Sequence, residues 1–372
     1  MERVRNNLSA TRKARGLGAA ELANKVGVTR QTIYAIEAGT YIPNTEVTLR
    51  LARELEVTVE DLFSLPQAQD GETSGASAEY LSQGPAKTGQ AVRVCRVGGK
   101  WVSVPVDGRP YHLPEADAVV TGSAARSKKS KLRLFCEEET ASNKIVLAGC
   151  DPSTSLLARM VEQLSGVEIV HAPASSQLAL DWLKESKVHI AGSHLQDSQT
   201  SEFNLPIIKR QFPNRDMAVV TFARWEEGFV VAAGNPKKIR SIEDLGRGKV
   251  KIMNRERGSG SRALLDGLIH EAGLTAKTMR GYDTVTFGHL SAAHAVMAQQ
   301  ADCCIATRSA AQTFGLDFIP LRSEQYDFVL ERETLRLAAV QAMFDALQRA
   351  ALRRKLETLA GYDTSQTGVV RA

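Results

Sequence analysis

The sequence lacks any hydrophobic run that reaches the roughly 18 residues needed to cross a bilayer. The segment after Met1 lacks the apolar stretch of a secretory signal. Cysteine is scarce, because the chain has only five, an odd number without a CxxC pair. That count argues against a disulfide framework and against a zinc site. We therefore expect a cytoplasmic protein with reduced thiols and no membrane association.

Catalytic patterns are missing as well: no Ser-His-Asp order, paired carboxylates or histidine cluster stands out along the chain, so we expect no enzyme. What is present is a composition of 43% hydrophobic and 24% charged residues, which is typical of a soluble globular protein. At about 150 residues per domain, the 372 residues predict two or three domains. The net charge of +5 permits nucleic-acid contact but is too small to establish it.

Changes of composition along the chain predict five segments. Residues 66–89 are rich in Gln, Gly, Ser and Ala and cannot bury enough apolar area to form a core. Apolar and polar residues then alternate on either side of Gly98-Gly99, which predicts a β-hairpin. The expected order is a helical domain (1–65), a linker (66–89), a small β subdomain (90–125), a basic connector (126–142) and an α/β unit (143–372).

Two short helices joined by a glycine turn are predicted near the N-terminus. The first ends before Gly27, and Thr29 is placed as the N-cap of the second, which spans residues 30–38. This arrangement is the helix-turn-helix unit, whose second helix presents side chains to the major groove of DNA. Residues 1–30 carry a net charge of +5 and residues 31–65 one of −4, so one side of the domain is suited to phosphate.

These residues resemble the phage-repressor or XRE type of helix-turn-helix over residues 8–63. The pattern that carries the resemblance is Leu22-Ala23, Gly27-Val28-Thr29, Ile33, Ile36-Glu37, Gly39, Pro43, Leu49 and Leu51. The resemblance implies that Arg30, Gln31 and Tyr34 face the bases, with the arginine suited to guanine and the glutamine to adenine. It also places near the DNA backbone Thr29, Thr32 and Asn44. The alternative is a helical bundle that makes only protein contacts.

Strands and helices alternate after about Ser142, which predicts a parallel sheet with crossover helices. Three strand-to-helix turns, at residues 150–157, 173–177 and 254–262, carry hydroxyl groups where a helix begins. Helix N-termini offer unpaired N–H groups and a partial positive charge, and open α/β sheets bind ligands at this edge. One such turn is usually an N-cap, but three together predict an anion pocket. The pocket is not a P-loop, because the GK[ST] motif is missing.

Residues from about Ile145 to Gly368 resemble the periplasmic-binding-protein-like domain that occurs fused to helix-turn-helix modules. They are also similar to tungstate- and molybdate-binding proteins of the type II fold. The matching stretches are Ser153-Thr154-Ser155, Pro173 to Leu178, Val188 to Gly192, Asn204-Leu205-Pro206, Gly234-Asn235-Pro236, Asn254-Arg255, Gly258 to Arg262, and Gly361 to Ser365. The implied fold is multidomain: an all-α helix-turn-helix head, a small β segment and a two-lobed α/β type II periplasmic-binding-protein-like domain.

The same resemblance implies that an oxyanion is held between the lobes by a group of six residues, Ser153, Thr154, Ser155, Ser259, Ser261 and Arg262. The turns themselves add Ser175, Ser176 and Gly260 as candidates. His194 follows the third strand, and two roles are equally expected for it: contact with the ligand, or a hydrogen bond at the hinge between the lobes. Asp151 stands where the tungstate-binding relatives have threonine, and its carboxylate would repel a dianion. For His289 we expect a core or surface role.

We interpret the chain as a one-component transcriptional regulator whose partners are a double-stranded DNA operator and a small anionic effector. Molybdate or tungstate leads among the effectors, followed by phosphate-bearing or molybdopterin-related small molecules, and no cofactor or metal is expected. A homodimer or higher homo-oligomer is expected because helix-turn-helix proteins commonly read two half-sites. Two alternatives stay open for the α/β lobes: a cytosolic enzyme, and a dimerisation scaffold without a ligand.

Overall fold

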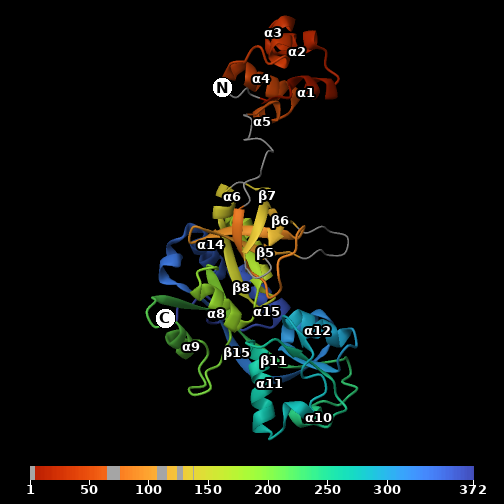
Figure 1. Cartoon of the computed structure of the whole chain (residues 1–372), viewed down its shortest axis with the longest axis vertical. Coiled ribbons are helices and arrows are strands. Elements are labelled where there is room, and N and C mark those ends of the chain that lie inside the picture. The colour runs from red at the N-terminus through yellow and green to blue at the C-terminus, as the bar shows by residue number, and fades with distance from the viewer. Residues whose placement is uncertain (1–4, 65–75, 107–114, 124–128, 137) are drawn as a thin grey trace. The chain divides into compact units, whose positions relative to one another are not determined.

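The computed structural model describes residues 5–64, 76–106, 115–123, 129–136 and 138–372 (Figure 1). The chain divides into two compact units, Met1–Ser74 and Gly75–Ala372. The first unit is helical, and the second combines a β-barrel with an α/β sheet. The predicted fold class is confirmed: a helical head, a β segment and a two-lobed α/β domain. Within the described ranges, none of the helices has both the length and the apolar character needed to span a membrane.

The first unit folds around one apolar core, in which Leu22, Ile33, Ile36, Leu51 and Leu62 are fully buried. Burial of each such side chain stabilises the unit by about 1.5–3 kcal/mol. Its elements are β1 (Arg5–Asn6), α1 (Leu8–Ala14), α2 (Ala19–Val26), α3 (Arg30–Glu37), α4 (Thr45–Leu55), α5 (Val59–Leu62) and β2 (Phe63–Ser64), with β1 and β2 paired antiparallel.

The predicted helix–turn–helix is present as α2 and α3. Gly27 follows α2 in the left-handed conformation, at φ 75°, which a residue without a Cβ adopts most easily. The Thr29 hydroxyl accepts a hydrogen bond from the Thr32 N–H at 3.1 Å, so the second helix begins at Arg30 as predicted. It ends at Glu37, one residue before the predicted end.

Five strands close into a small barrel in the order β3-β5-β4-β6-β7. The predicted hairpin is confirmed as β4 and β5, which pair antiparallel around Gly98 and Gly99 at φ 53° and 76°. Positive φ at both central residues is the requirement of the two-residue turn that suits twisted strands. The strands are β3 (Ala76–Tyr80), β4 (Ala91–Val97), β5 (Lys100–Pro105), β6 (Ala118–Ser123) and β7 (Lys129–Leu134).

Two predicted boundaries are wrong, because β3 lies within the expected linker (66–89) and β7 within the expected basic connector (126–142). In β7, the side chains of Ser130 and Leu132 are buried between exposed basic residues. The exposed basic residues Lys129, Lys131 and Arg133 therefore form the solvent face of a strand. The positive charges concealed the alternation of buried and exposed positions that is typical of a strand. The rest of those predicted segments includes residues 66–75, 126–128 and 137, which lie outside the described residues.

The barrel shares a core with the α/β sheet, so the predicted β subdomain is not separate from it. Cys95, Val97 and Val102 of the barrel pack with Val146 and Val170 of the sheet. Buried charge joins the two parts as well. The ammonium of Lys144, which is 5% exposed, lies 2.8 Å from an Asp117 carboxylate oxygen and 3.0 Å from one of Glu168. A buried cation needs such partners, because an unpaired one costs several kcal/mol.

The α/β part contains an eight-stranded sheet in the order β13-β12-β14-β11-β15-β10-β8-β9. Its strands are β8 (Lys144–Gly149), β9 (Glu168–Pro173), β10 (Ile190–Ser193), β11 (Met217–Val231), β12 (Ile252–Arg255), β13 (Val285–Thr286), β14 (Cys303–Thr307) and β15 (Asp317–Glu331). Its helices are α6 (Glu138–Ser142), α7 (Thr154–Ser165), α8 (Ser176–Lys184), α9 (Leu205–Gln211), α10 (Ile242–Gly246), α11 (Gly260–Glu271), α12 (His289–Met297), α13 (Arg308–Thr313), α14 (Ala338–Leu347) and α15 (Ala350–Ala360), with short 3₁₀ turns at Ala276–Thr278 and Arg332–Arg336.

The sheet is mixed, so the expectation of a parallel sheet holds only at its two sides. β8 pairs in parallel with β9 and β10, and β12 with β13 and β14. Between them, β11 and β15 are 15 residues each and pair antiparallel. β15 was not predicted from the sequence, because the polar residues 322–325 interrupt its apolar pattern. In the fold the side chains of Glu324 and Gln325 are nevertheless buried.

The long strands β11 and β15 divide the sheet into two lobes. In the first lobe, Ile145 and Leu147 of β8 face α7, α14 and α15, while Val146 and Ala148 face α8 and α9. The second lobe repeats this layering. In β14, Cys303 packs against α10 and α11, and Cys304 packs against α12 and α13. Figure 1 shows α10, α11 and α12, in teal to cyan, gathered at this end of the sheet. Both lobes therefore present strand ends and helix starts to each other along β11 and β15.

His189 provides a pH-dependent contribution to the stability of the first lobe. Its Nδ1 accepts a hydrogen bond from the Val146 N–H at 3.0 Å, and burial lowers its pKa to about 4. An unfolded chain protonates histidine near pH 6.5, so the unfolded state binds more protons between pH 6.5 and 4. We expect the contribution of His189 to the free energy of unfolding to fall by about 2–3 kcal/mol as the pH drops through this window.

The variant His189→Asn keeps an acceptor in place of Nδ1 but cannot titrate. Urea unfolding followed by tryptophan fluorescence reports the second unit, because Trp101, Trp182 and Trp225 all lie there. The variant should lose less stability than the wild type between pH 7 and 4.5. Replacement of the exposed His270 by asparagine is the matched control. Equal losses in the wild type and His189→Asn would contradict the assignment.

Candidate functional site

Helix α3 exposes the three side chains that are predicted to contact bases. Arg30, Gln31 and Tyr34 are exposed, and the Arg30 guanidinium lies 5.2 Å from the centre of the Tyr34 ring, with a 2.9 Å hydrogen bond to its hydroxyl. Thr29 and Asn44 are exposed too, and their side chains cap α3 and α4, while Thr32 is half-buried. The side chains predicted to read bases are therefore free of the core.

Arg12 contributes to the net charge of +5 in residues 1–30, but it is not exposed where it could contact phosphate. Its guanidinium is buried and makes two hydrogen bonds to the Glu37 carboxylate, at 2.6 and 3.1 Å, and one to the Leu17 carbonyl at 2.8 Å. The hydrogen bond to Glu37 raises the pKa of Arg12. This ion pair fixes α1 against the end of α3 and leaves the first unit with one basic side chain fewer for DNA.

The three predicted turns in the second unit meet where the two lobes touch. The Gln177 N–H, at the start of α8 in the first lobe, donates to the Gly258 carbonyl of the second lobe at 3.2 Å. The His194 ring lies against Gly260 at the start of α11, where an added Cβ would be 2.4 Å from it. Cys150, in the first turn, has its sulfur 3.4 Å from Nε2 of the same histidine. His194 is thus the point at which the three turns converge.

The hydroxyl groups of these turns are engaged within their own turns or with neighbouring side chains. Those of the first turn bind Asp151 and the backbone: Ser153 donates to the Asp151 carboxylate at 2.9 Å, and Thr154 to its carbonyl at 2.7 Å. Ser155 is exposed and donates to the Pro152 carbonyl. The Ser175 hydroxyl caps α8.

The remaining predicted residues are also engaged. Ser176 accepts from the His194 N–H, Ser259 accepts from the Arg262 N–H, and Ser261 donates to the Glu227 carboxylate. The Arg262 guanidinium pairs with Asp266 at 3.2 Å and lies over the Tyr282 ring. Where these groups donate, as Ser153, Thr154 and Ser261 do, a ligand would have to replace the acceptor they already have. The Ser175 and Ser176 hydroxyls act as acceptors, and a hydroxyl that accepts can still donate.

Charged and aromatic side chains fill the space between the turns; the sequence had singled out His194 and Asp151 near the pocket, but not most of the others. We call this group the interlobe centre; its residues are Cys150, Asp151, His194, Trp225, Glu227, Arg255, Glu256, His289, Glu324, Tyr326 and Tyr362. They come from both lobes and from the long strands β11 and β15. For Glu324 and Tyr326, the polar residues inside β15 were a signal in the sequence that was not used.

Several polar atoms of the interlobe centre lack a hydrogen-bond partner among the described residues. They are Asp151 Oδ2, Trp225 Nε1, Glu227 Oε2, Arg255 Nη1, both ring nitrogens of His289, and Tyr326 Oη. Buried polar groups are usually paired, and each unpaired one costs about 1–3 kcal/mol. So many unpaired atoms in one place are typical of a site that binds a polar ligand rather than of a core.

A family model described as the PBP superfamily domain matches residues 157–348, just over half of the chain. The chain belongs to the PBP superfamily. A second model, described as helix-turn-helix, matches residues 8–62. The chain is 32% identical to YvgK of Bacillus subtilis (strain 168) over 226 residues, which cover 61% of this chain and 73% of YvgK. It is 45% identical over 65 residues to an HTH-type transcriptional regulator of Methanothermobacter thermautotrophicus, covering 17% of this chain and 94% of that protein.

Solved structures with a similar fold include the effector-binding domain of QuiR in complex with shikimate, at 15% identity and a TM-score of 0.41, covering 57% of this chain and 96% of that one. Peb3 from Campylobacter jejuni is 15% identical with a TM-score of 0.40, covering 58% and 97%. At these values the likeness carries no inference about a ligand. From the family matches, the protein is a helix-turn-helix transcriptional regulator with a PBP-like ligand-binding domain.

Burial changes the acidity of two carboxyl groups in the PBP domain. It raises the pKa of Asp151 to about 6, against the opposing hydrogen bonds from Ser153. Burial, and then the neighbouring Glu324 carboxylate, raises the pKa of Glu227 to about 8. Glu227 is therefore largely protonated at neutral pH, where its carboxyl group can donate a hydrogen bond. The centre can thus offer both donors and acceptors to a ligand.

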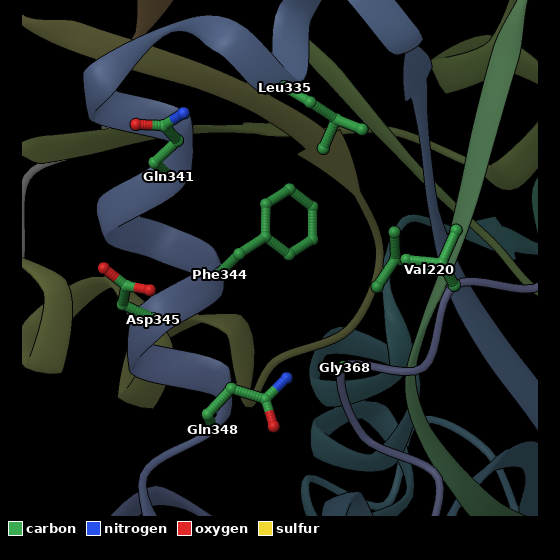
Figure 2. A pocket seen from close by; sticks show the side chains of 8 residues that line it. Val220, Leu335, Gln341, Phe344, Asp345, Gln348 and Gly368 are labelled. Carbon is green, nitrogen blue, oxygen red and sulfur yellow. The ribbon is translucent and has the colours of Figure 1, made fainter.

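Two hollows of the PBP domain are lined by residues of both lobes. The lining of the smaller one includes two residues of the interlobe centre, and that of the larger one includes none. The larger, of about 360 Å³, is bordered by Gln177, Ser259 and Arg262. The smaller, of about 90 Å³, is bordered by Cys150 and Glu256. A third hollow, of about 380 Å³, lies away from the centre. Figure 2 shows Phe344 of α14 projecting into it toward Val220 of β11.

Proposed function

We propose that this regulator binds its operator through α3, and that a small polar molecule bound at the interlobe centre sets its affinity for DNA. The observation that carries this proposal is the set of unpaired buried atoms where the lobes meet. A ligand that pairs with several of them favours the closed arrangement of the lobes. Couplings between two such sites are typically about 1–3 kcal/mol, or 5- to 150-fold in affinity.

We further propose that the regulator acts as a homodimer or a higher homo-oligomer. Each chain carries a single recognition helix, α3, and helix-turn-helix proteins usually read two half-sites one DNA turn apart. In a dimer, movement of one lobe against the other alters the spacing between the two heads. The effector then acts on DNA affinity without touching the DNA.

An oxyanion of the molybdate or tungstate kind is the effector we propose first. Unpaired donors support it: Arg255 Nη1, Trp225 Nε1 and Tyr326 Oη. Three hydrogen bonds to an anion contribute roughly 5–9 kcal/mol before the costs of association. The Asp151 carboxylate opposes a dianion, but Ser153 and Tyr362 already donate hydrogen bonds to it at 2.9 Å.

Thermal unfolding in the presence of molybdate, tungstate, sulfate and phosphate tests this effector class. At a concentration 100-fold above Kd, a ligand stabilises the folded protein by about 2.7 kcal/mol. For a unit that spans Gly75–Ala372 we expect the Tm to rise by about 4 °C with the preferred anion. Trp225→Phe removes one unpaired donor and should weaken binding about tenfold.

Trp182→Phe is the matched control, because Trp182 is buried in the first lobe outside the interlobe centre. It should leave the Tm shift as in the wild type. The oxyanion proposal is rejected if none of the four anions changes the Tm. It is equally rejected if the two tryptophan variants respond to an anion in the same way as the wild type.

A further inference from the structure

Three side chains with metal-binding atoms meet at the interlobe centre. Cys150 follows β8, His194 follows β10, and His289 begins α12, and their ligand atoms all lie within 4.8 Å of one another. Ligands around a tetrahedral ion, at bond lengths of about 2.0–2.3 Å, stand roughly 3.3–3.8 Å apart. Small side-chain shifts therefore bring the three atoms onto one ion. We propose that these residues bind a transition-metal cation of the zinc, cobalt and nickel class.

The environment of His289 distinguishes this cluster from an ordinary packed core. Its side chain is fully buried, and neither ring nitrogen has a hydrogen-bond partner among the residues that the structure describes. Glu227 Oε1 lies 3.8 Å from Nδ1, beyond hydrogen-bonding distance. An imidazole buried without partners loses the hydrogen bonds it makes in water. A bond to a metal replaces one of them and leaves the other ring nitrogen for a neighbouring carboxyl group.

His194 is already oriented as a metal ligand. Its Nε2 faces the Cys150 sulfur at 3.4 Å, while Nδ1 on the opposite side of the ring is bonded to the Glu324 carboxylate. Arg322 in turn holds Glu324, with its Nε 2.8 Å from Oε1. A carboxylate on the far nitrogen is the usual partner of a ligating histidine, because it fixes the direction of the ring. Glu324 is therefore a positioning residue for this site.

The charge and the donor set at the centre favour this class of cation. Glu227 is largely protonated at neutral pH, but the other carboxylates that the described residues place there still outnumber the guanidinium groups: Asp151, Glu256 and Glu324 against Arg255 and Arg322. Two imidazoles and a thiolate suit zinc-like ions and are poor ligands for magnesium or calcium. Cys150 binds as the thiolate and releases its proton to water. Three protein ligands leave one position open for water or a small anion.

This inference deepens the proposed function, because it adds a cation to the site at which we place the effector. Cys150 and His194 belong to the first lobe and His289 to the second, so one ion would join the lobes. The sequence argued against a zinc site because it has no CxxC pair. The three ligands are instead separated by whole strands and helices, and only the closure of the lobes brings them together.

The test is titration of the full-length, metal-stripped protein with Co²⁺, followed by displacement with Zn²⁺. We expect one cobalt ion per chain, with the visible absorption of a tetrahedral ion and a near-ultraviolet thiolate-to-metal band. His289→Gln should weaken binding about 100-fold or more, and Cys150→Ser should remove the thiolate band. His294→Gln, exposed on the same helix, and Cys136→Ser, in the segment after β7, are the matched controls and should leave binding unchanged.

The proposal fails if the wild type takes up no stoichiometric cobalt, or takes it up without a thiolate band. It also fails if His289→Gln and Cys150→Ser melt at the wild-type temperature and bind cobalt as tightly as the wild type. Operator affinity with and without Zn²⁺ tests the proposed function separately. An unchanged affinity leaves the metal site standing and rejects metal control of DNA binding, whereas a failed cobalt titration leaves the response to oxyanions untouched.

Discussion

Arg30→Ala is expected to abolish operator preference while the first unit stays folded. Arg30 is exposed at the start of α3, and its contacts with the Tyr34 ring and hydroxyl lie outside the apolar core. A two-pronged contact between arginine and guanine contributes about 1–3 kcal/mol of discrimination between bases. A dimer makes this contact twice, so specific affinity should fall roughly 30-fold or more.

The measurement begins with DNA fragments that the wild type selects from a random pool, followed by footprinting of both proteins on the selected site. Arg53→Ala is the matched control, because Arg53 is exposed near the end of α4 and its loss removes the same charge. That control should weaken binding to all sequences slightly and leave the footprint in place. A footprint of Arg30→Ala identical to that of the wild type would refute the role of α3 in reading bases.

Gly228→Ala is expected to have the largest effect on the stability of the PBP domain. Gly228 lies in β11 beside an irregularity in its pairing with β15, and an added Cβ would be 2.1 Å from the Ile319 carbonyl oxygen. Backbone atoms cannot give way without separating the two central strands. We expect the free energy of unfolding to fall by about 3 kcal/mol or more. The preceding residue, Glu227, belongs to the interlobe centre, so ligand affinity should fall as well.

Gly267→Ala is the matched control for this variant. Gly267 is exposed inside α11, and none of the described atoms lies close enough to contact an added Cβ. Alanine in a helix interior is favoured over glycine by about 0.8–1.0 kcal/mol, so this replacement should stabilise the domain. Urea unfolding followed by tryptophan fluorescence measures both. A Gly228→Ala protein as stable as the wild type would contradict the close packing of β11 on β15.

The helix-turn-helix head was predictable because its determinants are local. The left-handed Gly27 and the Thr29 cap act within three residues of their own positions, and the predicted helix bounds differ from the observed ones by one residue. The charge count over residues 1–30 includes Arg12, and its burial could not be predicted, for the opposite reason. Its partner Glu37 is 25 residues away, and no local pattern connects the two.

The interlobe centre was predictable in its position and, among its residues, in His194. The three hydroxyl-bearing turns do meet, as the carboxyl ends of neighbouring strands in an α/β sheet should. Their hydroxyl groups, however, bond within or beside the turns. The unpaired atoms belong to side chains such as Trp225 and Arg255, for which the sequence contains no motif.

The sequence by itself determined where the chain makes helices, hairpins and strand-to-helix turns, because caps, glycines and apolar spacing act between near neighbours. Only the tertiary structure decided that β15 runs beside β11 despite its polar residues. It also decided which polar groups are buried without a partner at the contact of the lobes. The physical reason is that pairing and desolvation depend on groups distant in sequence, so no local spacing encodes them.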